Sequence, residues 1–330
     1  MNKIGILGAG TWGIALARLL ANNNNDVTVW SHNEDAIIEL KKTHRHSYFL
    51  DVELPISIKY TSLIDMACID KDIIVFAVPS IYVREVAKKA NNYINSQQII
   101  VDVAKGIEKD TLMTLSEVIK DELGNVKVVA LSGPTHAEEV IKDMPTTIVA
   151  SCENIEVSKY VQGVFASNFF RVYTNIDIKG TEICGALKNI MALAAGMSDG
   201  LGYGDNAKAA IITRGLQEMK RLGTKMGCLD STFSGLTGVG DLIVTCTSRH
   251  SRNNRCGYLI GQGKKVDEAI KEIGMVVEGL NALPAAIKLK DKYNVEMPIV
   301  STLNEIINHG LDPKEAVNNL FRRELKSEVV

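Results

Sequence analysis

One lysine lies in a stretch of the chain that is otherwise small or apolar. Residues 183–198 carry a single charge, that of Lys188, among neighbours such as Cys184 and Met191. A lysine without surrounding water has a lowered pKa and can donate or accept a proton near neutral pH. Such a group would supply the proton when hydride reduces a carbonyl, and its charge would stabilise the developing alkoxide. The alternative is a half-buried helix whose lysine side chain extends to solvent.

Two later stretches contain groups that could work with this lysine. Asp241 directly follows a glycine-rich loop, residues 234–240, where it could hold the lysine or a substrate hydroxyl, or else cap a helix. Residues 248–255 concentrate three arginines among serine and asparagine side chains. Guanidinium forks, hydroxyls and amides suit a phosphate group. In a chain that is otherwise nearly neutral, this favours a phosphate site over a merely solvated basic patch.

A glycine motif near the N-terminus indicates a dinucleotide as a further ligand. The apolar run 4–7 leads into Gly8, Gly10 and Gly13, spaced GxGxxG, and apolar residues at helical spacing follow. In a strand, turn and helix, these glycines make the tight turn, let the backbone approach a pyrophosphate and let the helix pack on the strand. The phosphates would lie at the helix N-terminus. An ordinary strand-to-helix turn is the alternative.

The residues after the second predicted strand, 27–30, bear on the choice of nucleotide. An NAD-specific fold usually carries an acid at the end of this strand for the ribose hydroxyls, and Glu34 or Asp35 could serve. However, Asn33 is typical of a helix N-cap with two acids in the first turn. On that interpretation the strand end has no carboxylate, which favours NADPH, with NAD possible.

The elements that must position these groups alternate between strand and helix in the first half of the chain. Because ligands of a parallel sheet bind at the carboxyl ends of its strands, Lys105 is placed to meet an anion, a solvated surface lysine being the alternative. Gly133 and Thr135 would present backbone N–H groups and a hydroxyl at the same edge. Further strands are predicted at residues 72–79, 99–103, 126–131, 146–151 and 169–174, a helix at 82–91 and a loop at 43–55.

Composition and pattern together predict two domains. After residue 178 the strand patterns almost vanish, so we expect a dinucleotide-binding α/β domain over residues 1–178 and an all-helical domain over 179–330. With 46% hydrophobic and 23% charged residues the chain has material for both cores. A net charge of -2 argues against a general nucleic-acid binder.

Other features of the sequence exclude several kinds of protein. No apolar run reaches the roughly 18 residues that cross a bilayer, and no signal sequence is apparent, so we expect a cytoplasmic protein. The six cysteines are scattered without a CxxC pair. The histidines of the 43–55 loop are irregularly spaced. We therefore expect neither a metal site nor a disulfide framework.

Together these motifs are similar to those of the bacterial-type, NAD(P)-dependent glycerol-3-phosphate dehydrogenases. The resemblance implies an N-terminal Rossmann domain with a parallel sheet, followed by a helical domain, usually in a homodimer. It also implies reversible hydride transfer between NAD(P)H and dihydroxyacetone phosphate, giving sn-glycerol 3-phosphate for phospholipid synthesis. The matching stretches are GAGTWG, FAVPS, VAKGIE, LSGPTHAEEV, FRVYTN, GALKNIMALAAGMSDGLGYGDNAKAA, TFSGLTGVGDLIVTCTSRHSRNNR and GMVVEG.

Position by position, the resemblance makes Lys188 the proton acceptor or, in the reducing direction, the donor. Asn33 stands where many relatives carry arginine and Phe49 where tyrosine is usual, so the choice between NADPH and NADH stays open. The implied substrate contacts are Lys105, Gly133, Thr135, Lys188, Asp241, Ser251, Arg252 and Asn253. The implied nucleotide contacts are Gly8, Gly10, Thr11, Trp12, Gly13, His32, Phe49, Lys105, Ala137, Arg252, Val276 and Glu278.

Two other functions are weighed against this one. A dehydrogenase of the same plan that acts on a 3-hydroxy acid or a sugar acid would need a carboxylate site in place of a phosphate site. A dinucleotide-sensing regulatory protein without turnover would need no proton donor. The isolated lysine argues against the sensor.

Overall fold

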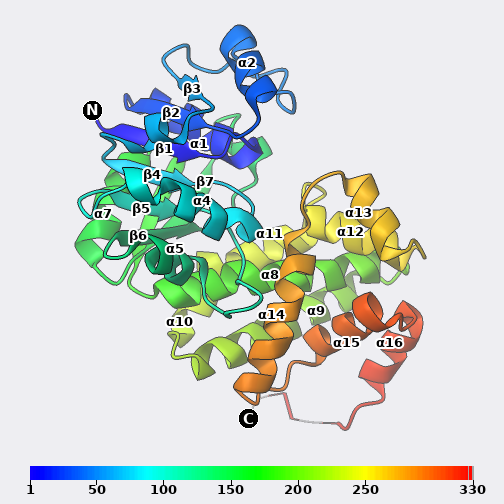
Figure 1. The fold of residues 1–330 in the computed structure, drawn as a ribbon. Coiled ribbons are helices and arrows are strands. Elements are labelled where there is room, and N and C mark those ends of the chain that lie inside the picture. Colours follow the sequence, from blue (N-terminus) through cyan, green and yellow to red (C-terminus); the bar gives the residue numbers. More distant parts are fainter. Residues whose placement is uncertain (326, 329–330) are drawn as a thin grey trace.

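The computed structural model describes residues 1–325 and 327–328, which form a sheet region followed by a helical region (Figure 1). The sheet has the strand order β3-β2-β1-β4-β5-β6-β7-β8. Each neighbouring pair is parallel except β6 and β7, so the expected parallel sheet is mostly, but not wholly, parallel. The strands are β1 Lys3–Leu7, β2 Asp26–Trp30, β3 Lys59–Thr61, β4 Ile73–Phe76, β5 Ile99–Asp102, β6 Lys127–Ser132, β7 Thr146–Ser151 and β8 Phe170–Asn175.

Helices cover both faces of the sheet because the central strands are apolar on both sides. Ile6 and Val75 pack with α1, α2 and α7 on one face. Leu7 and Phe76 pack with α3, α4 and α5 on the other. Strands that are buried on both faces read as continuous apolar runs, as residues 73–76 do. These helices are α1 Thr11–Asn22, α2 Glu34–Thr43, α3 Ile64–Cys68, α4 Val83–Ala90, α5 Leu115–Leu123, α6 Ala137–Val140 and α7 Ile155–Phe165.

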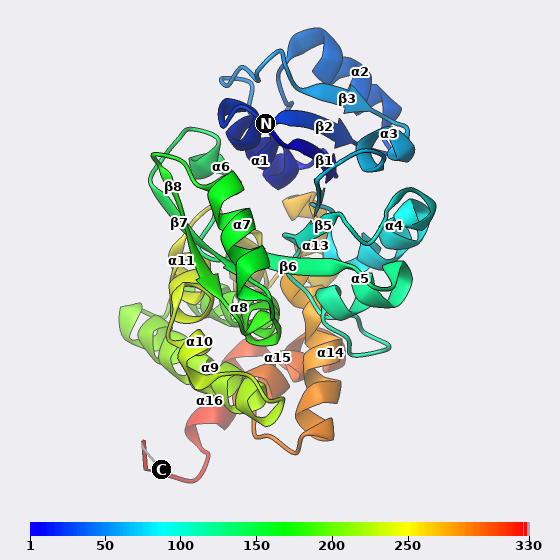
Figure 2. The same ribbon diagram turned by 90° about the vertical axis from the view of Figure 1, so that its left-hand side faces the viewer.

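The helical region is built around α8, whose residues 180–193 are all buried. Figure 2 shows α8 beneath the sheet, with α9 and α14 beside it. Its contact with α12 is close, since a Cβ on Gly257 would lie 2.1 Å from the carbonyl oxygen of Leu193. The helices are α8 Ile178–Gly200, α9 Asp205–Lys225, α10 Asp230–Phe233, α11 Asp241–Thr247, α12 Arg252–Gly261, α13 Val266–Ile273, α14 Glu278–Lys292, α15 Pro298–His309 and α16 Pro313–Phe321.

Three short turns complete the connections between these elements. They are η1 Ser80–Tyr82, η2 Asn91–Tyr93 and η3 Leu236–Gly240. The turn η3 is a single π-helical turn that runs directly into α11. It replaces part of the loop expected over residues 234–240 and brings Asp241 onto the face of α8.

Candidate active site

The glycine turn between β1 and α1 has the geometry that its spacing predicts. Gly8 has φ +127°, a conformation that side chains other than glycine rarely adopt, and a Cβ there would lie 2.4 Å from the carbonyl oxygen of Ala77. A Cβ on Gly13 would lie 2.1 Å from the carbonyl oxygen of Gly8, so this glycine lets α1 approach β1. Gly10 is exposed and has open space around it. As the N-cap of α1 it leaves the helix N-terminus without a side-chain cap, which suits an anion.

The other residues assigned to the nucleotide differ in how they are exposed. Thr11 and Trp12 are half-buried in the first turn of α1, and His32 is exposed beyond β2. The Phe49 side chain is only 3% exposed and lies edge-on to Tyr48. Phe49 is therefore mainly a core residue beside α1 and β2.

The end of β2 has no buried carboxylate. The Asn33 side chain accepts a hydrogen bond from the backbone N–H of Ala36 over 3.1 Å, so the predicted N-cap is confirmed. Glu34 and Asp35 are exposed in the first turn of α2. Carboxylates at this position favour the positive end of the helix dipole.

Glu278 and Ala137 each begin a helix. Ala137 is the buried first residue of α6, and Val276 lies half-buried just before α14. Both carboxylate oxygens of Glu278, the first residue of α14, accept hydrogen bonds from Ser80, at 3.0 Å from its backbone nitrogen and 2.5 Å from its hydroxyl. This contact joins the loop after β4 to the helical region.

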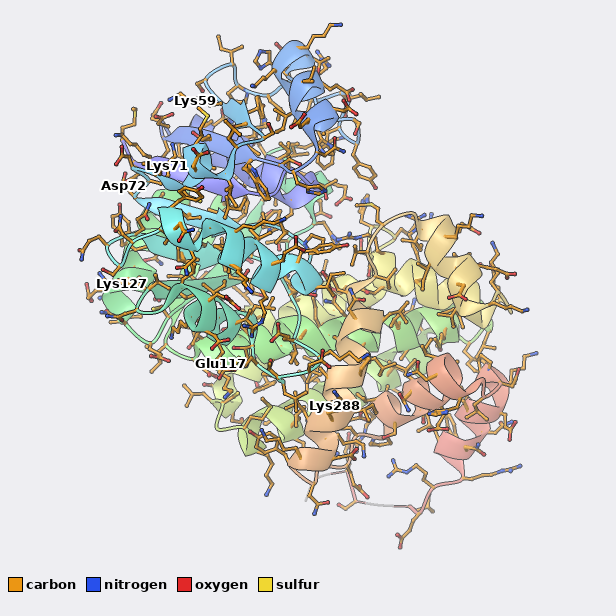
Figure 3. All side chains as sticks on the ribbon, viewed as in Figure 1. Lys59, Lys71, Asp72, Glu117, Lys127 and Lys288 are labelled. Carbon is orange, nitrogen blue, oxygen red and sulfur yellow. The ribbon has the colours of Figure 1, made fainter. Side chains whose placement is uncertain are left out.

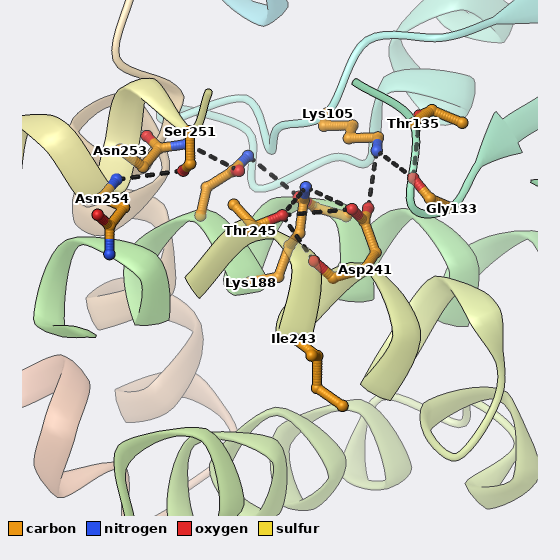
Figure 4. A network of polar contacts seen from close by, with 12 residues as sticks. Lys105, Gly133, Thr135, Lys188, Asp241, Ile243, Thr245, Ser251, Asn253 and Asn254 are labelled. Atoms are coloured by element: carbon orange, nitrogen blue, oxygen red, sulfur yellow. Dashed lines mark hydrogen bonds and ion pairs between the residues drawn. The ribbon is translucent and has the colours of Figure 1, made fainter. Parts of the chain in front are cut away.

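Lys188 is the most deeply buried lysine among the described residues. Lys59 and Lys288, labelled in Figure 3, are surface lysines for comparison. Their side chains are 63% and 48% exposed. Lys188 is 6% exposed, so the alternative of a side chain extending to solvent is wrong. Its Nζ donates to Asp241 Oδ1 over 2.7 Å and to the Thr245 hydroxyl over 2.6 Å (Figure 4).

Asp241 joins the two lysines that the sequence singles out. Its Oδ2 lies 2.7 Å from Lys105 Nζ, and Lys105 also donates to the carbonyl of Gly133 over 3.0 Å (Figure 4). The Thr135 hydroxyl donates to the same carbonyl. Asp241 begins α11 and uses both carboxylate oxygens on lysines, so it is a partner of Lys188 rather than an N-cap. The structure thus brings Lys105, Gly133, Thr135, Lys188 and Asp241 into one connected group.

Burial and charge act on these groups in opposite directions. Burial lowers the pKa of Lys188 to about 8, even though Asp241 acts to raise it. Burial alone would raise the pKa of Asp241, but the ammonium groups of Lys105 and Lys188 outweigh it and hold that pKa below its ordinary value. The result is an anchored ammonium group that can lose its proton near neutral pH.

The predicted phosphate loop divides between two places. Ser251 caps α12 by accepting from the backbone N–H of Asn254, and Arg252 is half-buried in the first turn. Arg249 and Arg255 are exposed and line a cavity of about 560 Å³ together with Asn254. Arg252 is the first residue of α12, directly after the N-cap Ser251.

Asn253 connects this loop to the lysine. Its amide nitrogen donates to Asn189 Oδ1 over 2.9 Å, and its Oδ1 accepts from the backbone N–H of Gly279 over 2.8 Å. Asn189 follows Lys188 on α8. The Asn253 side chain thereby joins α8, α12 and α14, and its backbone N–H lies at the start of α12, where an anion would bind.

Sequence reasoning missed Asn189 and Thr245. Both signals were present, since Asn189 is adjacent to Lys188 and Thr245 lies one helical turn after Asp241. Neither residue type is chemically distinctive by itself. Their importance appears only when α8 is seen to pack against both α11 and α12.

Within residues 1–325 and 327–328 there is no group of three or more His, Cys, Asp or Glu side chains placed to hold a metal ion. In the same part of the chain, no helix has both the length and the apolar character needed to span a membrane.

Comparison with known proteins identifies the family. The N-terminal part of the NAD-dependent glycerol-3-phosphate dehydrogenases matches residues 3–158, and the C-terminal part matches residues 177–318. A glycerol-3-phosphate dehydrogenase of the NAD(P)+ type from Lactobacillus delbrueckii subsp. bulgaricus is 59% identical over 100% of this chain and 99% of its own. One from Bacillus pumilus is 53% identical over 98% of this chain and 95% of its own.

A solved structure agrees with these matches. The crystal structure of glycerol-3-phosphate dehydrogenase from Coxiella burnetii superposes with a TM-score of 0.94 at 37% identity, covering 98% of this chain and 99% of that one. The agreement spans both the sheet region and the helical region. The chain therefore belongs to the family of NAD-dependent glycerol-3-phosphate dehydrogenases.

Proposed function

We propose that the chain reversibly transfers a hydride between NAD(P)H and dihydroxyacetone phosphate, giving sn-glycerol 3-phosphate for phospholipid synthesis. The observation that carries this proposal is the buried ammonium of Lys188, 2.7 Å from Asp241 and beside Lys105. A group that donates a proton to a carbonyl oxygen during hydride reduction needs such an arrangement. Family membership supplies the substrate class.

The nucleotide site is proposed at the glycine turn. Gly10 and the uncapped start of α1 fit a pyrophosphate, while Gly8 and Gly13 shape the turn. When bound, the nicotinamide supplies or accepts the hydride. We propose NADPH as the preferred form, with NADH accepted, because the end of β2 carries no buried acid. The further proposed contacts are Thr11, Trp12, His32, Phe49, Lys105, Ala137, Arg252, Val276 and Glu278.

The substrate's phosphate is proposed to bind at the start of α12. Ser251, Arg252 and the backbone of Asn253 would hold it there, where a guanidinium and free N–H groups favour an anion. Gripping the phosphate orients a small molecule toward Lys188. In reduction Lys188 gives its proton to the carbonyl oxygen as the carbon gains hydride, and in oxidation it takes the hydroxyl proton as the carbon loses hydride. Lys105, Gly133, Thr135 and Asp241 complete the proposed contacts.

We further propose that the chain forms two domains, residues 1–178 and 179–330, and acts as a homodimer in the cytoplasm. Separate hydrophobic cores support the division, since the helical core gathers residues 183–303 apart from the two sheet cores, with Ile107 its one buried residue from the sheet region. The C-terminal family match begins at residue 177, next to this boundary, and the N-terminal match ends at residue 158. The resemblance supports the dimer, and six buried free thiols support a reducing compartment.

The test is an absorbance assay with purified protein. NADPH absorbance should fall when dihydroxyacetone phosphate is added, and NADH run in parallel gives the cofactor preference. Unphosphorylated dihydroxyacetone should react far more slowly because it lacks the group that α12 is proposed to hold. Oxidation of NADPH by a 3-oxo acid, and not by dihydroxyacetone phosphate, would favour the rival dehydrogenase.

A variant of the lysine sharpens the assay. Lys188→Met should reduce turnover at least about 100-fold, as expected for the loss of a general acid, with NADPH affinity retained. Lys59→Met, at an exposed lysine, is the matched control and should leave turnover unchanged. Near-normal turnover by the Lys188 variant would remove this lysine from its proposed role.

A further inference from the structure

One contact between the two regions lies beside the glycine turn and has no part in the proton transfer. Ser80 ends the FAVPS stretch and begins η1, and it satisfies both carboxylate oxygens of Glu278 with its N–H and its hydroxyl. Hydrogen bonds to a charged group are stronger than those between neutral groups. This pair therefore fixes the start of α14 against the loop that follows β4.

The backbone at Gly106 leaves room for the Ser80 side chain. A Cβ on Gly106 would lie 2.3 Å from Ser80 Cβ and 2.6 Å from its hydroxyl oxygen. An alanine at this position would force the Ser80 side chain out of its place. The glycine of the VAKGIE stretch thus makes room for the hydroxyl that reaches Glu278.

The same loop also contacts the glycine turn. The carbonyl oxygen of Ala77 would lie 2.4 Å from a Cβ on Gly8, and the Ala77 side chain would lie 3.3 Å from a Cβ on Gly13. Residues 77–80 therefore touch the proposed nucleotide turn at one end and Glu278 at the other. A shift of Glu278 would therefore be transmitted to the glycine turn between β1 and α1 through residues 77–80.

We propose that Ser80 is a positioning residue that uses Glu278 as a clasp, closing the helical region over the nucleotide. This inference rests on the proposed nucleotide site. The resemblance alone would make Glu278 a direct contact of the nucleotide. In the structure both of its oxygens accept hydrogen bonds from Ser80, and Asn281 also donates to one of them over 3.4 Å, so we expect the clasp to carry most of the effect of Glu278 on nucleotide affinity.

A second serine–glutamate pair provides a matched control for the contact between Ser80 and Glu278. Ser116 of α5 also gives its N–H and its hydroxyl to both oxygens of one glutamate, Glu182 of α8, at 2.7 and 2.6 Å. That pair likewise joins the sheet region to the helical region, but Ser116 is 3% exposed and Glu182 7%. Ser80 and Glu278 are only half-buried. The same serine-to-alanine substitution can therefore be compared in a buried pair and in the half-buried pair beside the proposed nucleotide site.

The experiment measures NADPH affinity directly, by the change in NADPH fluorescence on binding, and separately the steady-state constants with dihydroxyacetone phosphate. Ser80→Ala should raise the Kd and KM for NADPH about tenfold, the effect of losing one charge-assisted hydrogen bond. The KM for dihydroxyacetone phosphate and kcat should stay within about twofold. Ser116→Ala should lower Tm and leave the Kd for NADPH unchanged.

A double-mutant cycle separates the clasp from a direct contact. Glu278→Gln should weaken NADPH binding about as much as Ser80→Ala, and the double variant should bind no more weakly than either single one. Additive losses would mean that Glu278 contacts the nucleotide independently of Ser80, and wild-type affinity in Ser80→Ala would remove the clasp altogether. Because the Kd is measured without turnover, the result stands even if the wild-type protein fails to reduce dihydroxyacetone phosphate.

Discussion

Asp241 decides the chemistry of the site at the scale of single residues. Two ammonium groups share its carboxylate, each 2.7 Å away, in a position where Asp241 is 1% exposed. A buried charge without a partner costs much free energy, and an oppositely charged partner offsets much of that cost. Lys188 can therefore stay charged while burial still draws its pKa down to about 8.

Removing the charge of Asp241 should shift the pH profile of the reaction. Lys188 must be protonated to reduce a ketone, so kcat/KM in that direction should hold below about pH 8 and fall above it. Asp241 raises the pKa of Lys188. Asp241→Asn should therefore move the fall to lower pH by about one unit or more, as well as slow turnover. The pH dependence of NADPH oxidation measures both effects.

The reverse reaction and a control complete this test. For oxidation of sn-glycerol 3-phosphate, which needs the unprotonated amine, the rise of activity with pH should move to lower pH in the same variant. Asp230→Asn alters an exposed aspartate that pairs with Lys220 over 2.7 Å, and its profile should match the wild type. An unchanged inflection in Asp241→Asn would show that Lys188 is not the titrating group.

The sequence revealed the charged members of the site but not the groups that join them. An isolated lysine in residues 183–198 is conspicuous because charge is rare among apolar residues, and Asp241 is conspicuous after a glycine-rich loop. The bonds from Lys188 to Thr245 and from Asn253 to Asn189 cross between helices. Spacing along one helix cannot indicate which helix it will meet.

At the scale of elements, the start of α12 is the part of the site that depends most on helix geometry. Ser251 accepts from the backbone N–H of Asn254 over 3.2 Å, which leaves the N–H groups of Arg252 and Asn253 at the open end of the helix. Such N–H groups attract an anion because they have no partner within the helix. The cap therefore stabilises α12 and also orients the free N–H groups of its first turn.

Removing this cap should weaken substrate binding beyond its effect on stability. Ser251→Ala should cost about 1 kcal/mol of unfolding free energy, the usual value of an N-cap, and should raise the KM for dihydroxyacetone phosphate several-fold. Asn154→Ala removes a comparable cap from α7, where Asn154 accepts from the N–H of Glu156 over 3.0 Å. It should lower Tm similarly without changing that KM. Equal KM values in the two variants would contradict the proposed phosphate site.

The elements themselves were predictable where their apolar pattern was long and regular. The strand expected over residues 146–151 has those bounds in the structure. β3 was missed because it is only three residues long, Lys59–Thr61, and carries no apolar run. The antiparallel setting of β7 was missed because strand direction depends on the path of the connection. The helix α8 continues through Asp199 and Gly200, although glycine-rich stretches such as residues 199–204 more often form loops.

At the scale of the whole molecule, buried acids hold distant parts of the chain together. Glu182 joins α8 to α5, and Glu218 of α9 accepts from the backbone N–H groups of Ile299 and Val300 at the start of α15. Burial raises the pKa of Glu182 and of Glu218 to about 7, despite the hydrogen bonds that act to lower it. These acids satisfy helix ends that would otherwise be buried without partners.

The stability of the molecule should consequently fall as the pH rises from mildly acidic to neutral. Glu218 has an ordinary pKa of 4.5 when the chain is unfolded and about 7 when folded, so the folded state binds its proton more tightly. The stabilisation is fully present below about pH 4.5 and is lost as the pH rises through about 7. Each unit of that shift corresponds to roughly 1.4 kcal/mol.

Glu218→Gln removes the titrating group while keeping an oxygen for the N–H of Ile299. The free energy of unfolding, measured in urea between pH 5 and pH 8, should therefore depend less steeply on pH in this variant, with Glu182 responsible for part of the slope that remains. Glu305→Gln, at an exposed glutamate of α15, should keep the wild-type slope. A wild-type slope in Glu218→Gln would mean that the proton on this buried acid does not contribute to folding.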